Sequence, residues 1–468
     1  MWLQDVMANA ITWAMSGKMN DAMEQAYIAR RDELHELKAY YDGNQRQPLK
    51  ITLLGKNYNT ITPLTTAIVD RSVFALFGGG VTFENDETRE EQEELIRGIY
   101  KANKEFELLH DIGQFGAIYG TAFVKIIPNG TLDELGNVTY RLIALNPCMM
   151  TIVTAPDDIQ NITAYVSRWQ DGETAYREIT EKQVDESGNV TGWIVRIEKA
   201  DRDTRGEWVI LSESEWPYPF APIAHGKNLP RAGSVYGMSD IENVIALQDR
   251  YNEAQSNTNK ILALQAWAQK WITGGRWPRV KDKSGDEYVD IGPDKALEFG
   301  DPNVKVGILQ PSADLASSRQ FGLDLRRDIF YISGTTDPEN VTARLGNLTN
   351  FGLRVLYNNE LAKNKVKQKL YGDLLNDVNH RLLMLAGYTK EAALPGWIEW
   401  ADPLPENDTE EAQTVAQDVG AGLVSKQTAA EKRGYNWVQE QERMATEKQQ
   451  TANVGGNLIR DFLAGRGQ

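Results

Sequence analysis

The chain has 468 residues, of which 41% are hydrophobic and 25% charged, a composition typical of a globular protein of roughly three domains or lobes. Its 66 acidic residues outnumber 50 basic ones, and the net charge of −16 argues against a protein that wraps nucleic acid on a cationic surface. The single cysteine, Cys148, excludes a disulfide framework and a cysteine-rich zinc site, so we expect it to be a small core residue.

The first part of the chain favours helices. In residues 1–40, apolar residues recur at spacings of three and four, and the run ends at the stop signal Asp42-Gly43-Asn44. Residues 61–77 repeat the pattern before a short strand at 81–83. The acidic run 84–94 is interpreted as the solvated start of a helix rather than a metal site, and a further helix is expected over 105–120.

From Thr121 to about Pro222 the pattern changes to a period of two. Several segments alternate or are rich in β-branched and aromatic residues, which predicts an antiparallel, β-rich stretch of several strands. Asn129-Gly130 and Ser187-Gly188-Asn189 are interpreted as hairpin turns.

Two long helices are predicted around a small insertion. Ser239 to about Lys270 contains no Pro or Gly, begins at a cap formed by Ser239 and Glu242, and would span roughly 48 Å. Residues 272–312 are rich in Gly and Pro and read as a small β-containing insertion, followed by a helix over 314–332 and a polar loop over 334–350. A second long helix of roughly 50 Å over 351–385, a lone strand at 397–400 and a charged helical region from 405 complete the chain.

The common signatures of catalysis are missing. The sequence has no nucleotide P-loop, no dinucleotide-binding glycine fingerprint and no G-x-S-x-G nucleophile elbow. The four histidines are far apart and form no zinc-binding pair. Acidic clusters could support a metal-dependent nuclease, although a chain with 66 acidic residues contains such clusters by chance. Two long helices around a compact module suit a repeated subunit in a ring better than a closed enzyme pocket.

Several segments, in this order, carry a resemblance to a known family: 40–44 (YYDGN), 59–70, 77–83, 216–223 (WPYPFAPI), 237–241, 247–252 (LQDRYN), 346–349 (GNLT) and 403–427. Together they resemble the portal proteins of tailed bacteriophages of the siphophage type. Ala221 and Ala224 depart slightly from the family pattern.

The resemblance implies an α+β portal fold. It places a wing at 1–235 with 351–402, stem helices at 236–270 and 314–333, and a small β-containing clip at 271–313. It makes 334–350 a tunnel loop, 351–402 a long kinked helix followed by a wing strand, and 403–468 a helical crown.

The resemblance also implies a structural role without enzymatic activity, cofactor, metal or membrane. Twelve copies would form a ring at one vertex of the capsid in the virion, assembled in the host cytoplasm. Double-stranded DNA would pass through the lumen during packaging and ejection, pushed by a separate terminase. The partners implied are the terminase large subunit, head-completion or adaptor proteins, and the major capsid and scaffolding proteins. Twelve copies would carry roughly −190 charges, and an acidic lumen would repel the DNA backbone and keep the DNA sliding.

Three sets of residues are candidates for function under this resemblance. The tunnel-loop set is Thr336, Asn340, Arg344, Asn347 and Asn350. The clip set is Lys270, Arg276, Arg279, Lys281 and Lys283. The subunit-interface set is Trp267, Trp271 and Trp277, for which packing between subunits is favoured over base stacking.

Each set has an alternative reading. Arg344 contacts DNA phosphates weakly, forms a loop salt bridge near Asp337 and Glu339, or faces solvent. The clip cations either contact the terminase, an adaptor or DNA, or form a solvated rim balanced by the acidic residues that follow. Four lysines at every second position, Lys363, Lys365, Lys367 and Lys369, must divide over two faces of a helix; one pair faces the lumen or all are solvated.

Two other classes of protein remain as alternatives. A phage metal-dependent nuclease or other DNA-processing enzyme lacks an ordered motif of acidic residues and histidines. A capsid scaffold or adaptor fits poorly with the β-rich stretch. Hydrolysis by a monomer would favour the enzyme, and a ring without turnover would favour the portal.

Overall fold

A computed structural model describes residues 22–49, 57–132, 138–201, 204, 206–266, 269–275, 279–281, 285, 287–289, 302–309, 315–337, 350–404 and 415–446. The chain divides into two compact units, Met1–Asn347 with Arg354–Pro403, and Leu348–Leu353 with Leu404–Gln468. No helix among the described residues is long and apolar enough to cross a membrane. The mixture of helices and sheets confirms the α+β class.

The first unit begins with the expected helices. They are α2 (Ala22–Tyr41), α3 (Leu64–Phe77), α4 (Glu90–Ala102) and α5 (Glu105–Tyr119), with a 3-10 turn η1 (Glu87–Arg89) before α4. The acidic run therefore lies at the start of a helix, as predicted, where the helix dipole favours carboxylates. Gly120 ends α5 with φ +82°, and a side chain there would meet the carbonyl oxygen of Gly237.

Two antiparallel sheets follow α5. One has the order β3-β2-β9, and the other β4-β5-β6-β7-β8. Their strands are β2 (Thr121–Leu132), β3 (Val138–Leu145), β4 (Met150–Thr154), β5 (Ile162–Asp171), β6 (Thr174–Val184), β7 (Val190–Ala200), β8 (Val209–Trp216) and β9 (Ile223–Lys227). The β-rich stretch is confirmed.

The two predicted hairpin turns have different outcomes. The turn at Gly188 is confirmed, because the Asp185 N–H donates to the Asn189 carbonyl oxygen and Gly188 has φ +82°. The turn at Asn129-Gly130 is wrong. Strand β2 runs through both residues, and the ladder with β3 absorbs them in a register shift between Pro128 and Leu132.

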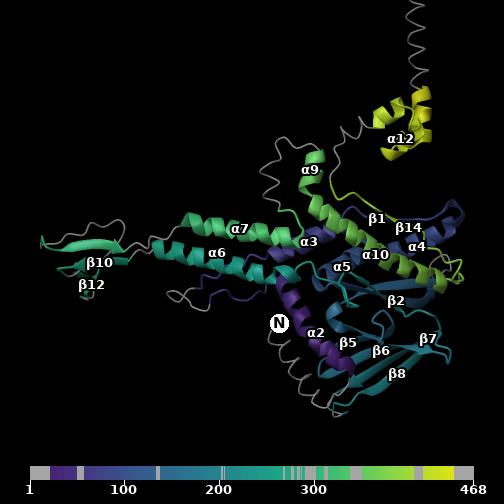
Figure 1. The fold of residues 1–468 in the computed structure, drawn as a ribbon, viewed down its shortest axis with the longest axis horizontal. Helices are drawn as coiled ribbons and strands as arrows, with labels where there is room; N and C mark the ends of the chain where they lie inside the picture. The colour runs from purple at the N-terminus through teal and green to yellow at the C-terminus, as the bar shows by residue number, and fades with distance from the viewer. Residues whose placement is uncertain are drawn as a thin grey trace, which may run out of the picture. The chain divides into compact units, whose positions relative to one another are not determined.

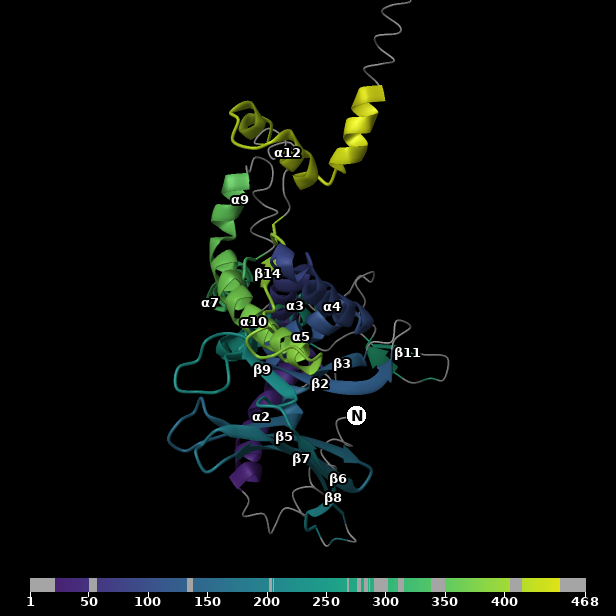
Figure 2. The same cartoon turned by 90° about the vertical axis from the view of Figure 1, so that its right-hand side faces the viewer.

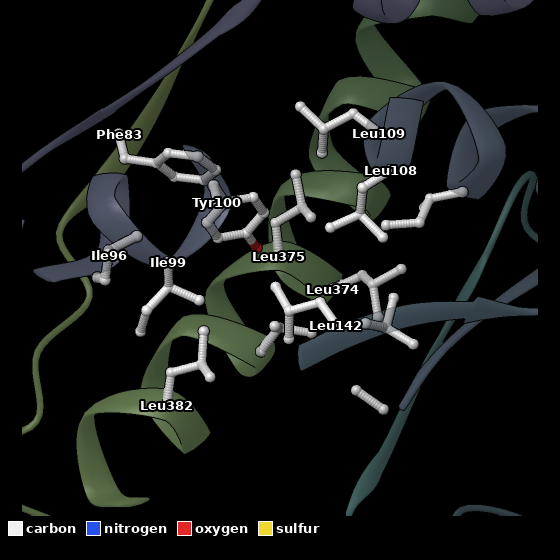
Figure 3. Close-up of a cluster of buried hydrophobic side chains, with 14 of the residues drawn as sticks. Phe83, Ile96, Ile99, Tyr100, Leu108, Leu109, Leu142, Leu374, Leu375 and Leu382 are labelled. Atoms are coloured by element: carbon white, nitrogen blue, oxygen red, sulfur yellow. The ribbon is translucent and has the colours of Figure 1, made fainter. Parts of the chain in front are cut away.

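The largest hydrophobic core joins segments far apart in the sequence. Leucines of α10 (Asn358–Leu385) pack against α4, α5 and the β2–β3 ladder (Figure 3). Burial of this many aliphatic side chains, each contributing about 1.5–3 kcal/mol, ties the C-terminal helix to the N-terminal half of the unit. A second core, which includes Cys148, lies between α2, α3, α5 and α7 (Leu315–Ser333), so Cys148 is a core residue as predicted.

The insertion and the two predicted helices on either side of it, 239–270 and 314–332, are present with changed boundaries. Helix α6 (Ile245–Ala266) pairs with α7 (Leu315–Ser333), and Figure 1 shows the two side by side. The insertion between them contains the antiparallel pairs β10 (Gln269–Thr273) with β13 (Lys305–Leu309), and β11 (Arg279–Lys281) with β12 (Glu287–Val289).

The first long helix is shorter than predicted. A 3-10 turn, η3 (Glu242–Val244), precedes α6, and the chain enters β10 at Gln269, so Lys270 lies in a strand and not in the helix. The 22 residues of α6 span about 33 Å instead of roughly 48 Å. Only half of the predicted cap forms, because the Ser239 N–H donates to Glu242 at 3.0 Å but the N-cap of η3 is Ile241 and not Ser239. The Ser239 hydroxyl instead donates to the carbonyl oxygens of Ala117 and Ile118 in α5.

The second long helix is divided. Helix α9 (Asn350–Leu356) ends before Tyr357, whose backbone has φ −89° and ψ 6°, and α10 follows. The strand expected at 397–400 is present as β14 (Trp397–Trp400), but it is not alone. It pairs antiparallel with β1 (Val81–Glu84), which joins the end of the unit to its beginning (Figure 1). Figure 2 shows β14 beside α10.

In the second unit, helical residues cover 415–420, 426–432 and 437–446, with α12 (Lys426–Lys432) in the middle segment. This agrees with the helical reading of the region from 405, within residues 415–446.

Candidate functional site

The base of α6 is fixed by polar side chains four residues apart. Gln248, Asn252 and Ser256 are fully buried and accept hydrogen bonds from backbone N–H groups of the extended segment 57–63 and Leu64. The three distances are 2.9 Å to Thr60, 3.1 Å to Thr62 and 3.2 Å to Leu64. These side chains thus satisfy the backbone N–H groups of a segment that is not in a sheet. The same hydrogen bonds hold the N-terminal half of α6 against that segment.

Helix α7 ends in a short segment held by ionic contacts. Gly334 has φ +67°, and the chain turns there out of α7. The Thr336 N–H donates to Glu360 of α10 at 2.9 Å, and Arg71 of α3 donates to the same carboxylate at 2.9 Å. Asp337 pairs with Arg326 of α7 at 2.8 Å. We name residues 334–337 with these partners the loop anchor, because they fix the first residues of the polar loop to three helices.

A buried ionic cluster lies beside the loop anchor. The Asp240 carboxylate, fully buried, binds the Lys367 ammonium at 2.5 Å and the Lys363 ammonium at 3.0 Å. Lys363 also donates to the Ser333 carbonyl oxygen at 2.7 Å, and Lys367 donates to the Ser72 hydroxyl at 2.7 Å. Asp240 therefore connects the start of the α6 segment to α10 and, through Lys363, to the end of α7.

The ionisation of this cluster follows from its surroundings. Burial alone would raise the pKa of Asp240, but the two ammonium groups outweigh burial and hold that pKa well below its usual range. Burial lowers the pKa of Lys367 to about 8, against the opposing pull of Asp240. The aspartate is thus a stable anion that compensates a buried cation.

The four lysines of α10 divide over two faces, as their spacing predicts. Lys363 and Lys367 point inward to Asp240, while Lys365 and Lys369 are exposed. The inward pair is structural, which the sequence reading missed. The available signal was the i, i+4 spacing of these two lysines with Tyr371, whose hydroxyl donates to Asn228 in the same buried region.

The other candidate residues are placed as follows. Thr336 belongs to the loop anchor, and Asn350 begins α9. Lys270 lies in β10, and Arg279 and Lys281 lie exposed in β11. Trp271 of β10 is partly exposed and packs on Gly307, where an added Cβ would lie 2.5 Å from the indole. Outside the described residues lie Trp267, Arg276, Trp277, Lys283, Asn340, Arg344 and Asn347.

The described residues do not bring these candidates together into a single cluster. They contain no group of three or more His, Cys, Asp or Glu side chains that could hold a metal ion. What the geometry offers is a pair of long helices, a β insertion between them, and a polar loop that leaves α7 from a rigid anchor.

Residues 20–454 match the sequence model of a family described as "Phage portal protein, SPP1 Gp6-like". The chain belongs to this family. Portal proteins are structural parts of the phage head, so this family member is a structural component and not an enzyme.

Two solved structures are similar to this portal protein at 14% sequence identity. One, titled "Virion of native gene transfer agent (GTA) particle", has a TM-score of 0.44 and covers 86% of this chain and 94% of its own. The other, titled "Neck of native GTA particle computed with C12 symmetry", has a TM-score of 0.43, with coverages of 80% and 90%. No curated protein matches the chain.

Proposed function

We propose that this portal protein is the subunit of a ring, twelve-membered by family resemblance, that forms a channel at one vertex of the capsid. Phage DNA enters through the channel during packaging and leaves through it during ejection. The ring docks the terminase large subunit and, after packaging, head-completion or adaptor proteins. It is built into the shell by the major capsid and scaffolding proteins in the host cytoplasm.

Apolar side chains exposed along α7 carry the proposal. Tyr331 is 74% exposed, and Phe321, Leu323 and Ile332 are also exposed on the same helix. A single subunit therefore presents apolar surface on one of its long helices, and such surface marks a contact with another protein. A ring of subunits covers these side chains when the helix pair of one copy packs against the next.

The parts of the chain have separate roles in this proposal. Helices α6 and α7 with their flanking residues, 236–270 and 314–333, form the stem, and 271–313 form the clip. Residues 334–350 form the tunnel loop, 1–235 with 351–402 form the wing, and 403–468 form the crown.

The candidate residues take roles within these parts. The tunnel loop leaves its anchor at Thr336 and faces DNA through Asn340, Arg344, Asn347 and Asn350. The clip cations contact the terminase, an adaptor or DNA, and these are Lys270, Arg276, Arg279, Lys281 and Lys283. The tryptophans Trp267, Trp271 and Trp277 pack between subunits.

The charge of the chain supports a channel through which DNA slides. Each subunit carries −16, so the summed potential of a ring repels phosphates and leaves no strong binding site for DNA. A few cations at the clip and in the tunnel loop then suffice for weak contacts that guide the duplex.

Particle symmetry of the purified protein tests the proposal. Negative-stain electron microscopy with native mass should give top views of a ring with a central hole and about twelvefold symmetry. Compact monomers or dimers that hydrolyse DNA in the presence of Mg²⁺ would overturn the proposal in favour of a nuclease. A separate assay tests whether DNA passes through the channel. It measures packaging of DNA into proheads by terminase, with and without the ring.

A further inference from the structure

Strand β8 forms an open edge of the five-stranded sheet. It ends the strand order β4-β5-β6-β7-β8, and β7 is the one described strand that pairs with it (Figure 1). Seven of its eight residues are exposed, and the eighth, Trp216, is partly buried. An edge of this kind presents backbone donors and acceptors on its outer side, which folded proteins normally block.

The edge also carries apolar surface. Val209, Ile210 and Leu211 are 45%, 55% and 51% exposed, an uninterrupted aliphatic run at the start of the strand. The ladder with β7 shifts register here, because Glu198 pairs with Ile210 while Ile197 pairs with Ser212. Aliphatic residues on an exposed edge favour pairing with a further strand.

Charges alternate across the strands that lead to this edge. Arg196 of β7 contacts Glu181 of β6 at 3.7 Å and Glu213 of β8 at 3.0 Å. Glu215 pairs in register with Ile194, so it lies on the same face as Glu213. Strand β8 contains no basic residue, so this alternation of charges across β6, β7 and β8 ends on carboxylates at the open edge.

We propose that β8 accepts an extended, basic segment of a partner protein as an added strand. The partner places basic side chains beside Glu213 and Glu215 and an apolar side chain beside Ile210. Backbone hydrogen bonds along the edge supply affinity, and the cross-strand pairs supply specificity. A second copy of β8 cannot take this place, because it would bring carboxylates and no cation to the edge.

A peptide and a charge exchange test the proposal. The probe is a short capped peptide in which two lysines at alternate positions precede two valines, and its match carries glutamates for the lysines. Fluorescence polarisation should show saturable binding of the lysine peptide to the intact protein. Ile210→Lys should weaken this binding by about tenfold or more, because an apolar contact is lost and a like charge is added.

Glu215→Lys makes the test specific. This variant should bind the lysine peptide about threefold more weakly than the wild type does. It should bind the glutamate peptide more tightly by a similar factor. Glu186→Lys, a charge reversal in the exposed turn between β6 and β7, should leave both affinities unchanged. Amide hydrogen exchange of 209–216 should slow when the lysine peptide binds, whether or not rings have formed.

Three results with the peptides would overturn the inference. They are no saturable binding of the lysine peptide, equal weakening by the Glu186 variant, or failure of the Glu215 variant to favour the glutamate peptide. Self-association of the wild-type protein that Ile210→Lys abolishes would instead make the edge a contact between copies, and would also overturn it. None of these outcomes depends on the ring symmetry that tests the proposed function.

Discussion

At the scale of single residues, the buried ammonium of Lys367 costs free energy to take out of water. A cation in a protein interior loses its hydration, and the loss is tolerated only where a counter-charge and further hydrogen bonds replace water. Asp240 and Ser72 supply these at 2.5 Å and 2.7 Å. The cluster joins three segments of the first unit. Removing Lys367 leaves Asp240 with Lys363 as its one remaining cation in the cluster, and removing Asp240 leaves both lysines without their counter-charge.

Removal of this cation should therefore destabilise the fold. Lys367→Met keeps most of the side-chain volume but deprives Asp240 of one of its two cations. We expect a loss of about 3 kcal/mol in the free energy of unfolding, measured by urea denaturation. Lys369→Met, which changes an exposed lysine on the same helix, should change stability by less than about 0.5 kcal/mol. Equal effects of the two variants would show that the buried ion pair makes no net contribution to the free energy of unfolding.

The same cluster predicts a dependence of stability on acid. The folded-state pKa of Asp240 lies below its unfolded value of about 4, so its contribution is fully present above that value. The contribution is lost as the pH falls towards the lowered folded-state pKa, because the unfolded chain then binds the proton first. Wild-type protein should thus lose more stability between pH 5 and pH 2 than Asp240→Asn. Parallel stability curves for the two proteins would contradict this assignment.

At the scale of elements, the loop anchor determines how rigidly the polar loop leaves α7. Glu360→Ala removes the acceptor of the Thr336 N–H and the partner of Arg71. Amide exchange at Thr336 should accelerate by about tenfold or more, since a charge-assisted hydrogen bond holds it closed. Glu391→Ala, an exposed control at the C-terminal side of α10, should leave this rate unchanged. An unaltered rate in the Glu360 variant would mean that other contacts hold the loop.

Local patterns in the sequence predict most of these elements, and long-range contacts explain the exceptions. The period of α3 and the turn at Gly188 depend on neighbouring residues, and both are correct. Asn129-Gly130 has the composition of a turn, yet it lies inside β2, in the irregular part of the ladder between the β3 pairs of Pro128 and Leu132. Strand β14 is only four residues long, and nothing near it in the sequence indicates its partner β1.

The ionic contacts were harder to predict than the elements. Lys363 and Lys367 show their shared face through their spacing, but Asp240 lies more than a hundred residues earlier, beside a serine that reads as a helix cap. Glu360 looks like an ordinary acid in the first turn of a helix. Their roles follow from packing between α3, α7 and α10, which no local pattern encodes.

At the scale of the whole molecule, assembly must overcome the repulsion between like-charged subunits. Each copy carries −16, and this repulsion is screened within about 10 Å at moderate salt. Apolar contacts are not screened, so the exposed side chains of α7 are the natural source of the opposing free energy. In the proposed ring, this balance would make stability sensitive both to salt and to a small number of apolar residues.

The paired change Phe321→Ser and Ile332→Ser tests this balance in the proposed ring. Both residues lie on one flank of α7, and each buried apolar side chain contributes about 1.5–3 kcal/mol. The loss recurs at every contact between neighbours, so native mass at low salt should show rings dissociating into smaller species. Added salt should partly restore the rings by screening the repulsion. Val438→Ser, an exposed apolar residue of the second unit, serves as the control, and rings unaffected by the α7 variant would place the contact elsewhere.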